Sequence, residues 1–242
     1  MRIDVLTLFP EVLRPYFAAS ILGRAQAASV AEIHTHQLRD FSTDSHHKVD
    51  DRPFGGGPGM VLSCQPVCDA VAAIEAADPR SAHRVLLTPQ GRRFDQSAAV
   101  RLASLPRLLV ICAHYEGYDE RIVELLQPEE ISLGDFVLTG GEIGALAIID
   151  AVVRLLPGAL GHEHGATDES FMSGCLEHPQ YTRPREFRGR RVPDVLLSGN
   201  HAEIDAWRRD TAVQRTRTRR PDLSGALETA AACRAPVRER ET

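Results

Sequence analysis

The feature that most constrains this chain is a regular alternation of short apolar runs and helical stretches within its first 160 residues. The apolar runs are rich in β-branched residues and have the length of buried strands. They occur at residues 3–8, 30–38, 84–89, 108–112 and 130–139. Between them lie stretches with helical spacing, and Pro10, Ser63 and Asp95 are typical helix-start residues. Strands alternating with helices predict an α/β domain with a mostly parallel sheet over residues 1–160.

The sequence changes in character after residue 160. Residues 161–175 are polar, contain several glycines and have no usable periodicity, which is typical of a flexible linker. Further on, Asn200 followed three residues later by Glu203 is typical of a helix N-cap. We therefore expect a small helical domain at 176–242, with a frayed tail beyond residue 220.

Charge is distributed unevenly along the chain. The net charge is −5, but residues 183–220 hold 11 arginines and only five acidic residues. Arginine binds phosphate in a bidentate manner, so this cluster favours a polyanionic partner such as a nucleic acid. The alternative is an arginine-rich composition without functional meaning, because Lys48 is the only lysine in the chain.

Two segments bear on localisation. The N-terminal apolar stretch is too short for a signal peptide, and the longest apolar segment, 143–153, contains Asp150 and is too short to span a bilayer. These features predict a cytoplasmic protein with no membrane partner.

Three glycine-containing turns follow apolar runs. They are "LLTPQG" at 86–91, "CAHYEGYDER" at 112–121 and "LTGGE" at 138–142. Because α/β sheets bind ligands at the carboxyl ends of their strands, we expect the three turns to surround one small molecule.

A fourth glycine-rich segment, "RPFGGGPGM" at 52–60, is a weaker signal. It lacks the Lys-Ser/Thr of a phosphate-binding loop, and no strand runs directly into it. Its glycines suit a loop packed against a ligand or a partner subunit, and an ordinary surface turn is about as consistent with the pattern.

Five motifs together resemble the bacterial tRNA (guanine-N1)-methyltransferases of the SPOUT superfamily. They are "LLTPQG", "YEGYDER", "ISLGDFVLTGGE", "ESFMSGCLEHPQYTRP" and "VLLSGNHAEIDAWR", in this order. The resemblance runs from residue 1 to about residue 216. It implies transfer of a methyl group from S-adenosylmethionine to N1 of guanosine 37 of tRNA, next to the anticodon, by a homodimer. It also implies that the three turns form a deep trefoil knot, an exception to the rule against threaded connections.

The resemblance assigns cofactor contacts to the three turns. Carried over position by position, the contacts are Leu86, Leu87, Thr88, Pro89, Gln90, Gly91, Ala113, Tyr115, Glu116, Gly117, Ser132, Leu133, Gly134, Asp135, Phe136, Val137, Leu138, Gly140 and Gly141. Many relatives have glycine where this chain has Ala113, so an extra methyl group is expected close to the cofactor.

The same resemblance assigns the catalytic residues. Guanine N1 is protonated at neutral pH and needs a general base, while the charge that develops on O6 needs a cationic donor. The donor is expected to be Arg154. Most relatives have an aspartate directly before "SF"; this chain has Glu169 there and Asp168 one residue earlier. We expect Glu169 to be the base and keep Asp168 as the alternative.

RNA contacts are expected from Tyr181, Arg183 and Arg185, together with the arginines nearer the C-terminus. The linker that carries the base is expected to become ordered when tRNA binds, which would couple the correct substrate to catalysis.

The histidines at 45–51 and 162–164 have no convincing ligand spacing, so we assign no metal site. The family is associated with magnesium, for which Glu116 and the base carboxylate are candidate partners through water.

Two other functions are compatible with part of the pattern. A relative that binds RNA without catalysis would keep the knotted fold but would not transfer a methyl group. A SPOUT enzyme that methylates the ribose 2′-hydroxyl would not need a base and an arginine beside guanine.

Overall fold

The computed structural model describes residues 1–161, 169–172 and 174–223. The chain divides into two compact units, Met1–Glu163 and His164–Thr242. Within the described residues, no helix has both the length and the apolar character that crossing a membrane requires. The predicted linker falls mostly outside the described residues and stays a prediction.

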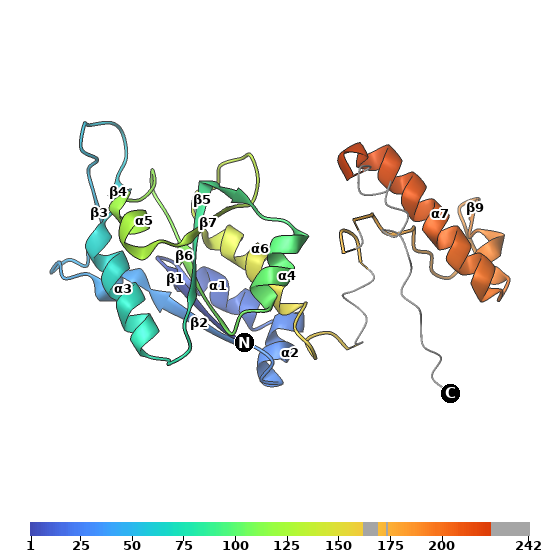
Figure 1. The fold of residues 1–242 in the computed structure, drawn as a ribbon, viewed down its shortest axis with the longest axis horizontal. Coiled ribbons are helices and arrows are strands. Elements are labelled where there is room, and N and C mark those ends of the chain that lie inside the picture. The colour runs from blue at the N-terminus through green and yellow to red at the C-terminus, as the bar shows by residue number, and fades with distance from the viewer. Residues whose placement is uncertain (162–168, 173, 224–242) are drawn as a thin grey trace. The chain divides into compact units, whose positions relative to one another are not determined.

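A five-stranded sheet forms the centre of the first unit (Figure 1). Its strands lie in the order β2-β1-β6-β5-β7, and every neighbouring pair is parallel. The bounds are Arg2–Thr7 for β1, Glu32–Gln37 for β2, His83–Arg93 for β5, Arg107–Cys112 for β6 and Glu129–Ser132 for β7. Parallel neighbours require crossover connections, which the helical stretches of the sequence supply. The predicted α/β class with a mostly parallel sheet is confirmed.

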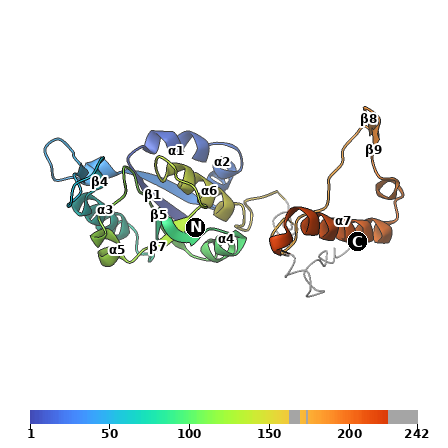
Figure 2. The same ribbon diagram turned by 90° about the horizontal axis from the view of Figure 1, so that it is seen from above.

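Helices cover both faces of this sheet (Figure 2). One face is covered by α1 (Pro10–Phe17), α2 (Ser20–Ala27), α4 (Gln96–Ala103) and α6 (Glu142–Val153). The other face is covered by α3 (Cys64–Ala76) and α5 (Arg121–Leu126). Because both faces of the inner strands are buried, β5 and β6 contain continuous apolar runs, whereas the edge strand β2 is polar and partly exposed.

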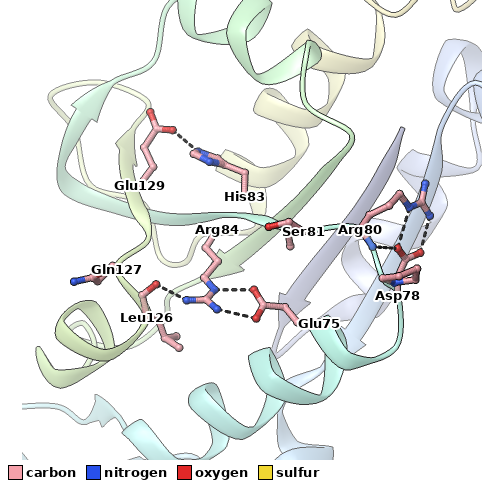
Figure 3. A pocket seen from close by; sticks show the side chains of 11 residues that line it. Glu75, Asp78, Arg80, Ser81, His83, Arg84, Leu126, Gln127 and Glu129 are labelled. Atoms are coloured by element: carbon pink, nitrogen blue, oxygen red, sulfur yellow. Dashed lines mark hydrogen bonds and ion pairs between the residues drawn. The ribbon is translucent and has the colours of Figure 1, made fainter.

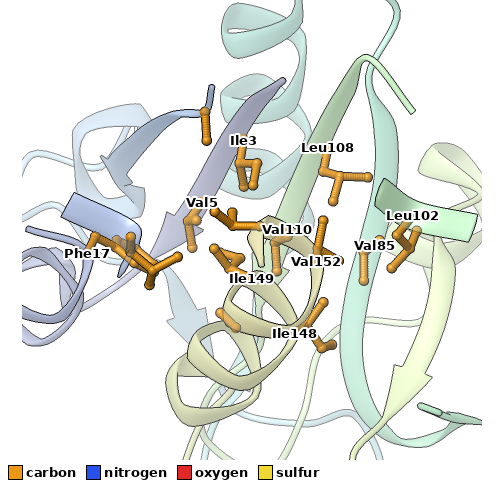
Figure 4. Close-up of a cluster of buried hydrophobic side chains, with 14 of the residues drawn as sticks. Ile3, Val5, Phe17, Val85, Leu102, Leu108, Val110, Ile148, Ile149 and Val152 are labelled. Carbon is orange, nitrogen blue, oxygen red and sulfur yellow. The ribbon is translucent and has the colours of Figure 1, made fainter. Parts of the chain in front are cut away.

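The larger core lies between the sheet and α6. Figure 4 shows Val5 of β1 and Val110 of β6 facing Ile149 and Val152 of α6, and all four side chains are fully buried. Burial of each such side chain contributes about 1.5–3 kcal/mol. Packing on this scale fixes α6, and with it the turn that precedes it.

The helix starts agree in part with the sequence signals. Pro10 is the first residue of α1, and Asp95 caps α4 by accepting a hydrogen bond from the Ala98 N–H at 2.8 Å. Ser63 occupies the N-cap position of α3 but makes no capping hydrogen bond through its side chain.

One predicted strand is shorter than expected. The run at 130–139 predicts a single strand, but β7 ends at Ser132. The Ser132 hydroxyl accepts a hydrogen bond from the Gly134 N–H at 3.2 Å, and Gly134 has φ +157°, so the backbone turns away from the sheet. Beyond the turn, Val137 is 82% exposed. The apolar residues 133–139 therefore form a loop, and the prediction was wrong for them.

Two short strands of the first unit were not predicted from the sequence, and neither was the two-stranded hairpin of the second unit. β3 (Asp50–Asp51) and β4 (Val61–Leu62) pair antiparallel at the base of the glycine-rich loop 52–60. Four of its glycines, at positions 55, 56, 57 and 59, have positive φ. Glycine tolerates positive φ because it has no Cβ.

A salt-bridge cluster lies at the β1–β6 boundary. Asp4 and Arg107 are fully buried, and Asp4 accepts hydrogen bonds from Arg107 Nε and Arg2 Nε, each at 2.9 Å. The Arg107 guanidinium also donates to the Ile74 carbonyl at 2.6 Å. Arg107 thus satisfies carbonyls at the end of α3 and ties that helix to the sheet.

Among its described residues, the second unit contains one long helix, α7 (His201–Arg219). Asn200 is its N-cap and accepts a hydrogen bond from the Glu203 N–H at 3.5 Å, as predicted. A two-stranded hairpin, β8 (Glu186–Phe187) and β9 (Arg190–Arg191), precedes α7 in the chain. The remaining elements are the 3-10 turns η1 (Leu38–Phe41) in the first unit, and η2 (Asp194–Leu197) and η3 (Pro221–Leu223) in the second.

Candidate functional site

A cavity of about 290 Å³ lies where the three glycine-containing turns meet, at the carboxyl ends of β6 and β7 and beside the bend in β5. Each turn supplies a separate part of its wall: 87–90, 113–118, and 132–133 with 136–141. The prediction that these turns converge is confirmed, because residues of all three turns line the same cavity.

Glycines allow the third turn to press against the end of β6. The Gly141 N–H donates a hydrogen bond to the Ala113 carbonyl at 2.8 Å. A Cβ at Gly141 would lie 2.7 Å from the Cys112 Cα, and one at Gly91 would lie 2.4 Å from the Ile131 N. These are contacts with backbone atoms that cannot move without moving strands, so glycine is required by close packing.

Most of the expected cofactor contacts line the cavity. Those that do are Leu87, Thr88, Pro89, Gln90, Ala113, Tyr115, Glu116, Gly117, Ser132, Leu133, Phe136, Val137, Leu138, Gly140 and Gly141. The other four do not line it. Leu86 is fully buried on the opposite face of the sheet, Gly91 packs against β7, and Gly134 and Asp135 belong to the loop without reaching the cavity wall.

Six further lining residues were not predicted. They are His114, Tyr118, Glu120, Ile131, Thr139 and Gly144. All but Gly144 fall within or next to the predicted segments, so their nearness in sequence to the predicted contacts could have identified them. Gly144 lies one turn into α6, and no local pattern marks it as part of the wall.

Tyr118 connects three segments around the cavity through its hydroxyl group. Its hydroxyl donates to the Glu130 carboxylate at 2.9 Å and lies 3.3 Å from the Thr88 hydroxyl. Burial, together with the neighbouring Glu130 carboxylate, raises the pKa of Tyr118 to about 12. The phenol therefore stays protonated at neutral pH and holds β5, β7 and the 113–118 loop in one arrangement.

A second buried polar group lies beside His114, which lines the cavity. Glu142, in the first turn of α6, is buried and accepts a hydrogen bond from the Thr7 hydroxyl at 2.7 Å. Its other oxygen lies 3.9 Å from His114 Nδ1, and the His114 ring packs between Phe9 and Tyr115. A carboxylate at a helix N-terminus is favoured by the helix dipole, which explains its tolerance of burial here.

The glycine-rich loop 52–60 packs against Glu116, which lines the cavity. A Cβ on Gly59 would lie 2.3 Å from the Glu116 side chain, and the Glu116 N–H donates to the Met60 carbonyl at 3.1 Å. The loop thus packs behind a cavity wall, whereas Phe54 near its tip is fully exposed.

The catalytic candidates lie in different units. Arg154 is the C-cap of α6, and its N–H donates to the Asp150 carbonyl at 3.1 Å. Glu169 begins a tight turn in the second unit, where its carbonyl accepts from the Met172 N–H at 3.2 Å. Asp168 lies outside the described residues. The roles of these three residues stay predictions.

The expected RNA-binding residues are exposed in the second unit. The Tyr181 ring lies 6.3 Å from the ring of Trp207 in α7, which holds the tyrosine beside that helix. Arg183 and Arg185 are exposed and lead directly into β8. Their accessibility is compatible with the expectation, and RNA contact by these residues stays a prediction.

A larger cavity, of about 460 Å³, lies at the amino end of β5 (Figure 3). Its polar groups are paired with one another: Arg84 with Glu75 at 2.7 Å, and His83 with Glu129 at 2.6 Å. Because these groups already satisfy each other, the cavity offers a ligand little to bind.

No group of three or more histidine, cysteine or acidic side chains arranged to hold a metal ion occurs among residues 1–161, 169–172 and 174–223.

The fold and the cavity define a class: an α/β protein whose small-molecule site is built from loops at the carboxyl ends of parallel strands. Comparison with known proteins is more specific. The family model described as tRNA (Guanine-1)-methyltransferase TrmD matches residues 1–226, and the chain belongs to this family.

Curated relatives agree along nearly their whole length. A tRNA (guanine-N(1)-)-methyltransferase of Rhodopirellula baltica is 55% identical over 226 residues, which cover 92% of this chain and 93% of the relative. Proteins of the same name from Dehalococcoides mccartyi and Bacillus cereus are 54% and 52% identical, each over 223 residues. Those matches cover 92% of this chain and 90% and 91% of the two relatives.

Proposed function

We propose that this protein transfers the methyl group of S-adenosylmethionine to N1 of guanosine 37 of tRNA, next to the anticodon. The observation that carries the proposal is the cavity in which three separate chain segments converge, in a chain that belongs to the tRNA (guanine-1)-methyltransferase family. S-adenosylmethionine supplies an electrophilic methyl group on a sulfonium.

The cavity suits such a ligand in size and lining. Its volume is close to the lower end of typical small-molecule sites, about 300 Å³. Leu87 and Leu138 offer apolar surface, while Gln90, Glu116 and the turn backbone offer polar groups. A Cβ at Gly140 would lie 2.5 Å from His114 Nδ1, so glycine keeps this part of the cavity wall close-packed.

Two side chains assist the methyl transfer in this proposal. Glu169 removes the proton from guanine N1, so that the N1 lone pair becomes available, and Arg154 donates hydrogen bonds to O6 as negative charge develops there. Arginine suits this role because it stays charged and presents several N–H donors. Asp168 is the alternative base.

The architecture follows the same proposal. The three turns form a deep trefoil knot of the SPOUT type within residues 1–160, residues 161–175 act as a linker, and residues 176–242 bind tRNA. The active form is a homodimer in the cytoplasm. Magnesium, where required, is held through water by Glu116 and the base carboxylate.

The decisive experiment measures transfer from labelled S-adenosylmethionine to unmodified tRNA transcripts with guanosine or adenosine at position 37. Wild type should label the guanosine transcript alone, and digestion should place the label on N1. Label on a ribose 2′-oxygen would instead support the 2′-hydroxyl methyltransferase. Binding of both substrates without transfer would support a non-catalytic RNA-binding protein.

Variants separate the residue roles. Glu169→Gln should reduce the single-turnover rate by about 10²–10⁴-fold, the usual contribution of a general base, whereas Asp168→Asn should not. The reverse result would make Asp168 the base. Arg154→Ala should abolish transfer while leaving S-adenosylmethionine affinity unchanged. A loss of cofactor affinity would show that Arg154 binds the cofactor and would contradict its proposed role at guanine O6.

A further inference from the structure

The β8–β9 hairpin of the second unit is unusually basic and fully exposed. Residues 183–191 contain five arginines and one acid, Glu186, and every residue from 181 to 191 is exposed. Figure 2 shows the hairpin standing away from α7, so it is not part of a packed core. A two-stranded hairpin gains little stability by itself, which makes its composition informative about contacts with other molecules.

Strand pairing sorts the side chains of the hairpin onto two faces. Phe187 pairs with Arg190, Glu186 pairs with Arg191, and the Val192 N–H donates to the Arg185 carbonyl at 2.9 Å. Because successive side chains alternate between faces, Phe187, Arg190 and Arg185 share one face, while Glu186 and Arg191 share the other.

The two faces differ in how their charges are satisfied. On the second face Arg191 lies 4.0 Å from Glu186 and 3.9 Å from Asp194. On the first face, no ion pair to Arg185 or Arg190 is formed by any acidic residue in the part of the chain that the structure describes. The first face thus presents positive charge that is available to an anion.

An aromatic ring lies at the centre of the first face. Phe187 is 61% exposed, although no core explains a phenylalanine there. The turn residues Arg188 and Gly189 both have positive φ, +49° and +73°, as in a two-residue hairpin turn, and the Arg188 guanidinium lies 5.2 Å from the Phe187 ring centroid. The Arg188 guanidinium therefore lies over the ring, and Arg185 and Arg190 share its face of the hairpin.

We propose that this face of the hairpin binds an unpaired nucleotide of the RNA substrate. The base stacks on Phe187, and Arg185, Arg188 and Arg190 hold the adjacent phosphates. An aromatic ring bordered by arginines is the combination that binds single-stranded nucleic acid, since stacking supplies affinity for the base and the cations for the backbone. The inference rests on the proposed function, because that function supplies an RNA with an exposed loop.

The test uses the full-length protein and an unmodified tRNA transcript with guanosine 37, titrated by fluorescence anisotropy at several salt concentrations. Phe187→Ala should weaken binding by about five- to a hundredfold, the range that loss of one stacked base produces, without changing the salt dependence. Phe187→Tyr keeps the ring and should bind like wild type.

Arg190→Ala and Arg191→Ala form the matched pair of charge variants, because they are neighbours on opposite faces. Arg190→Ala should lower the slope of log affinity against log salt by about 0.7, as expected for one lost phosphate contact to a single strand. Arg191→Ala should change both the affinity and the slope much less. Equal effects of the two variants would show that the hairpin attracts RNA by its positive charge alone, without a difference between its faces, and would overturn the proposal.

Controls distinguish a failure of the hairpin from a failure of the proposed function. S-adenosylmethionine affinity and thermal unfolding should be unchanged in all four variants, because the hairpin residues are exposed and are not part of a packed core. If wild type binds the transcript and Phe187→Ala binds it equally well, the hairpin proposal fails and the proposed function stands. If wild type does not bind tRNA, both fail.

Discussion

At the scale of single residues, the Asp4 carboxylate is fully buried and accepts hydrogen bonds from several basic side chains. Burial alone would raise its pKa, but hydrogen bonds from His36, Arg2 and Arg107 outweigh burial and hold the pKa of Asp4 well below its usual range. A carboxylate with a lowered folded-state pKa stabilises the protein at neutral pH, and this contribution is lost as pH falls through the folded-state pKa.

Asp4→Asn should therefore lower the free energy of unfolding at pH 7 by about 3–5 kcal/mol, because the buried Arg107 guanidinium loses its counter-charge. The variant should also lose less stability than wild type on acidification from pH 5. Denaturant unfolding at pH 7 and below pH 4 measures both effects. Glu32→Gln, in an exposed pair with Arg80, is the control and should change stability by less than about 1 kcal/mol. An Asp4→Asn protein as stable as wild type would contradict the argument.

A second residue-scale prediction concerns the turn that closes the cavity. Gly141→Ala should weaken S-adenosylmethionine binding at least about tenfold, because the new Cβ would lie 2.7 Å from the Cys112 Cα and would displace the turn. A tenfold loss of affinity corresponds to about 1.4 kcal/mol of binding free energy. Isothermal titration calorimetry measures the affinity. Gly161→Ala, with nothing within 4 Å of the new Cβ, should bind like wild type. Unchanged binding by the Gly141 variant would show that the turn can shift freely.

At the scale of secondary-structure elements, the N-cap of α4 offers a clean test. Asp95 accepts hydrogen bonds from the Ser97 hydroxyl at 2.6 Å and the Ala98 N–H at 2.8 Å, which lower the pKa of its carboxyl group. Asp95→Ala should destabilise the protein by about 1 kcal/mol, whereas Asp95→Asn, an equally good cap, should cost much less. Thermal unfolding compares the two variants. Equal destabilisation by both would assign the effect to charge instead of capping.

At the scale of the whole molecule, apolar residues remain exposed where α1 and α6 lie side by side. The Tyr16 hydroxyl joins the helices by donating to Asp150 at 2.6 Å, and Ile143 of α6 is 54% exposed. If this face forms the proposed homodimer, Ile143→Glu should shift the protein towards monomer in sedimentation experiments, because a charge would be buried in the interface. Leu125→Glu, at a 66% exposed position on α5 across the sheet, should not. Dimers that resist Ile143→Glu would exclude this face.

Much of the architecture followed from local patterns. The five apolar runs each overlap a strand of the sheet, and the Asp95 and Asn200 caps start the helices they were expected to start. The error at 133–139 has a physical cause: apolar character reports burial in general, and these side chains belong to a cavity-lining loop instead of a strand. Tyr118 and Gly144 were missed because their importance arises from contacts with residues distant in sequence.

The sequence by itself determined the alternation of strands and helices, the start of several helices, the places where glycine is needed and the family of the protein, because each depends on residues close together in the chain or on motifs carried in order. Only the tertiary structure decided the strand order β2-β1-β6-β5-β7, which side chains of the three turns face one cavity, and why Leu86 points away from it. These features depend on which distant apolar surfaces pack together, and that choice is made by burial across the whole domain.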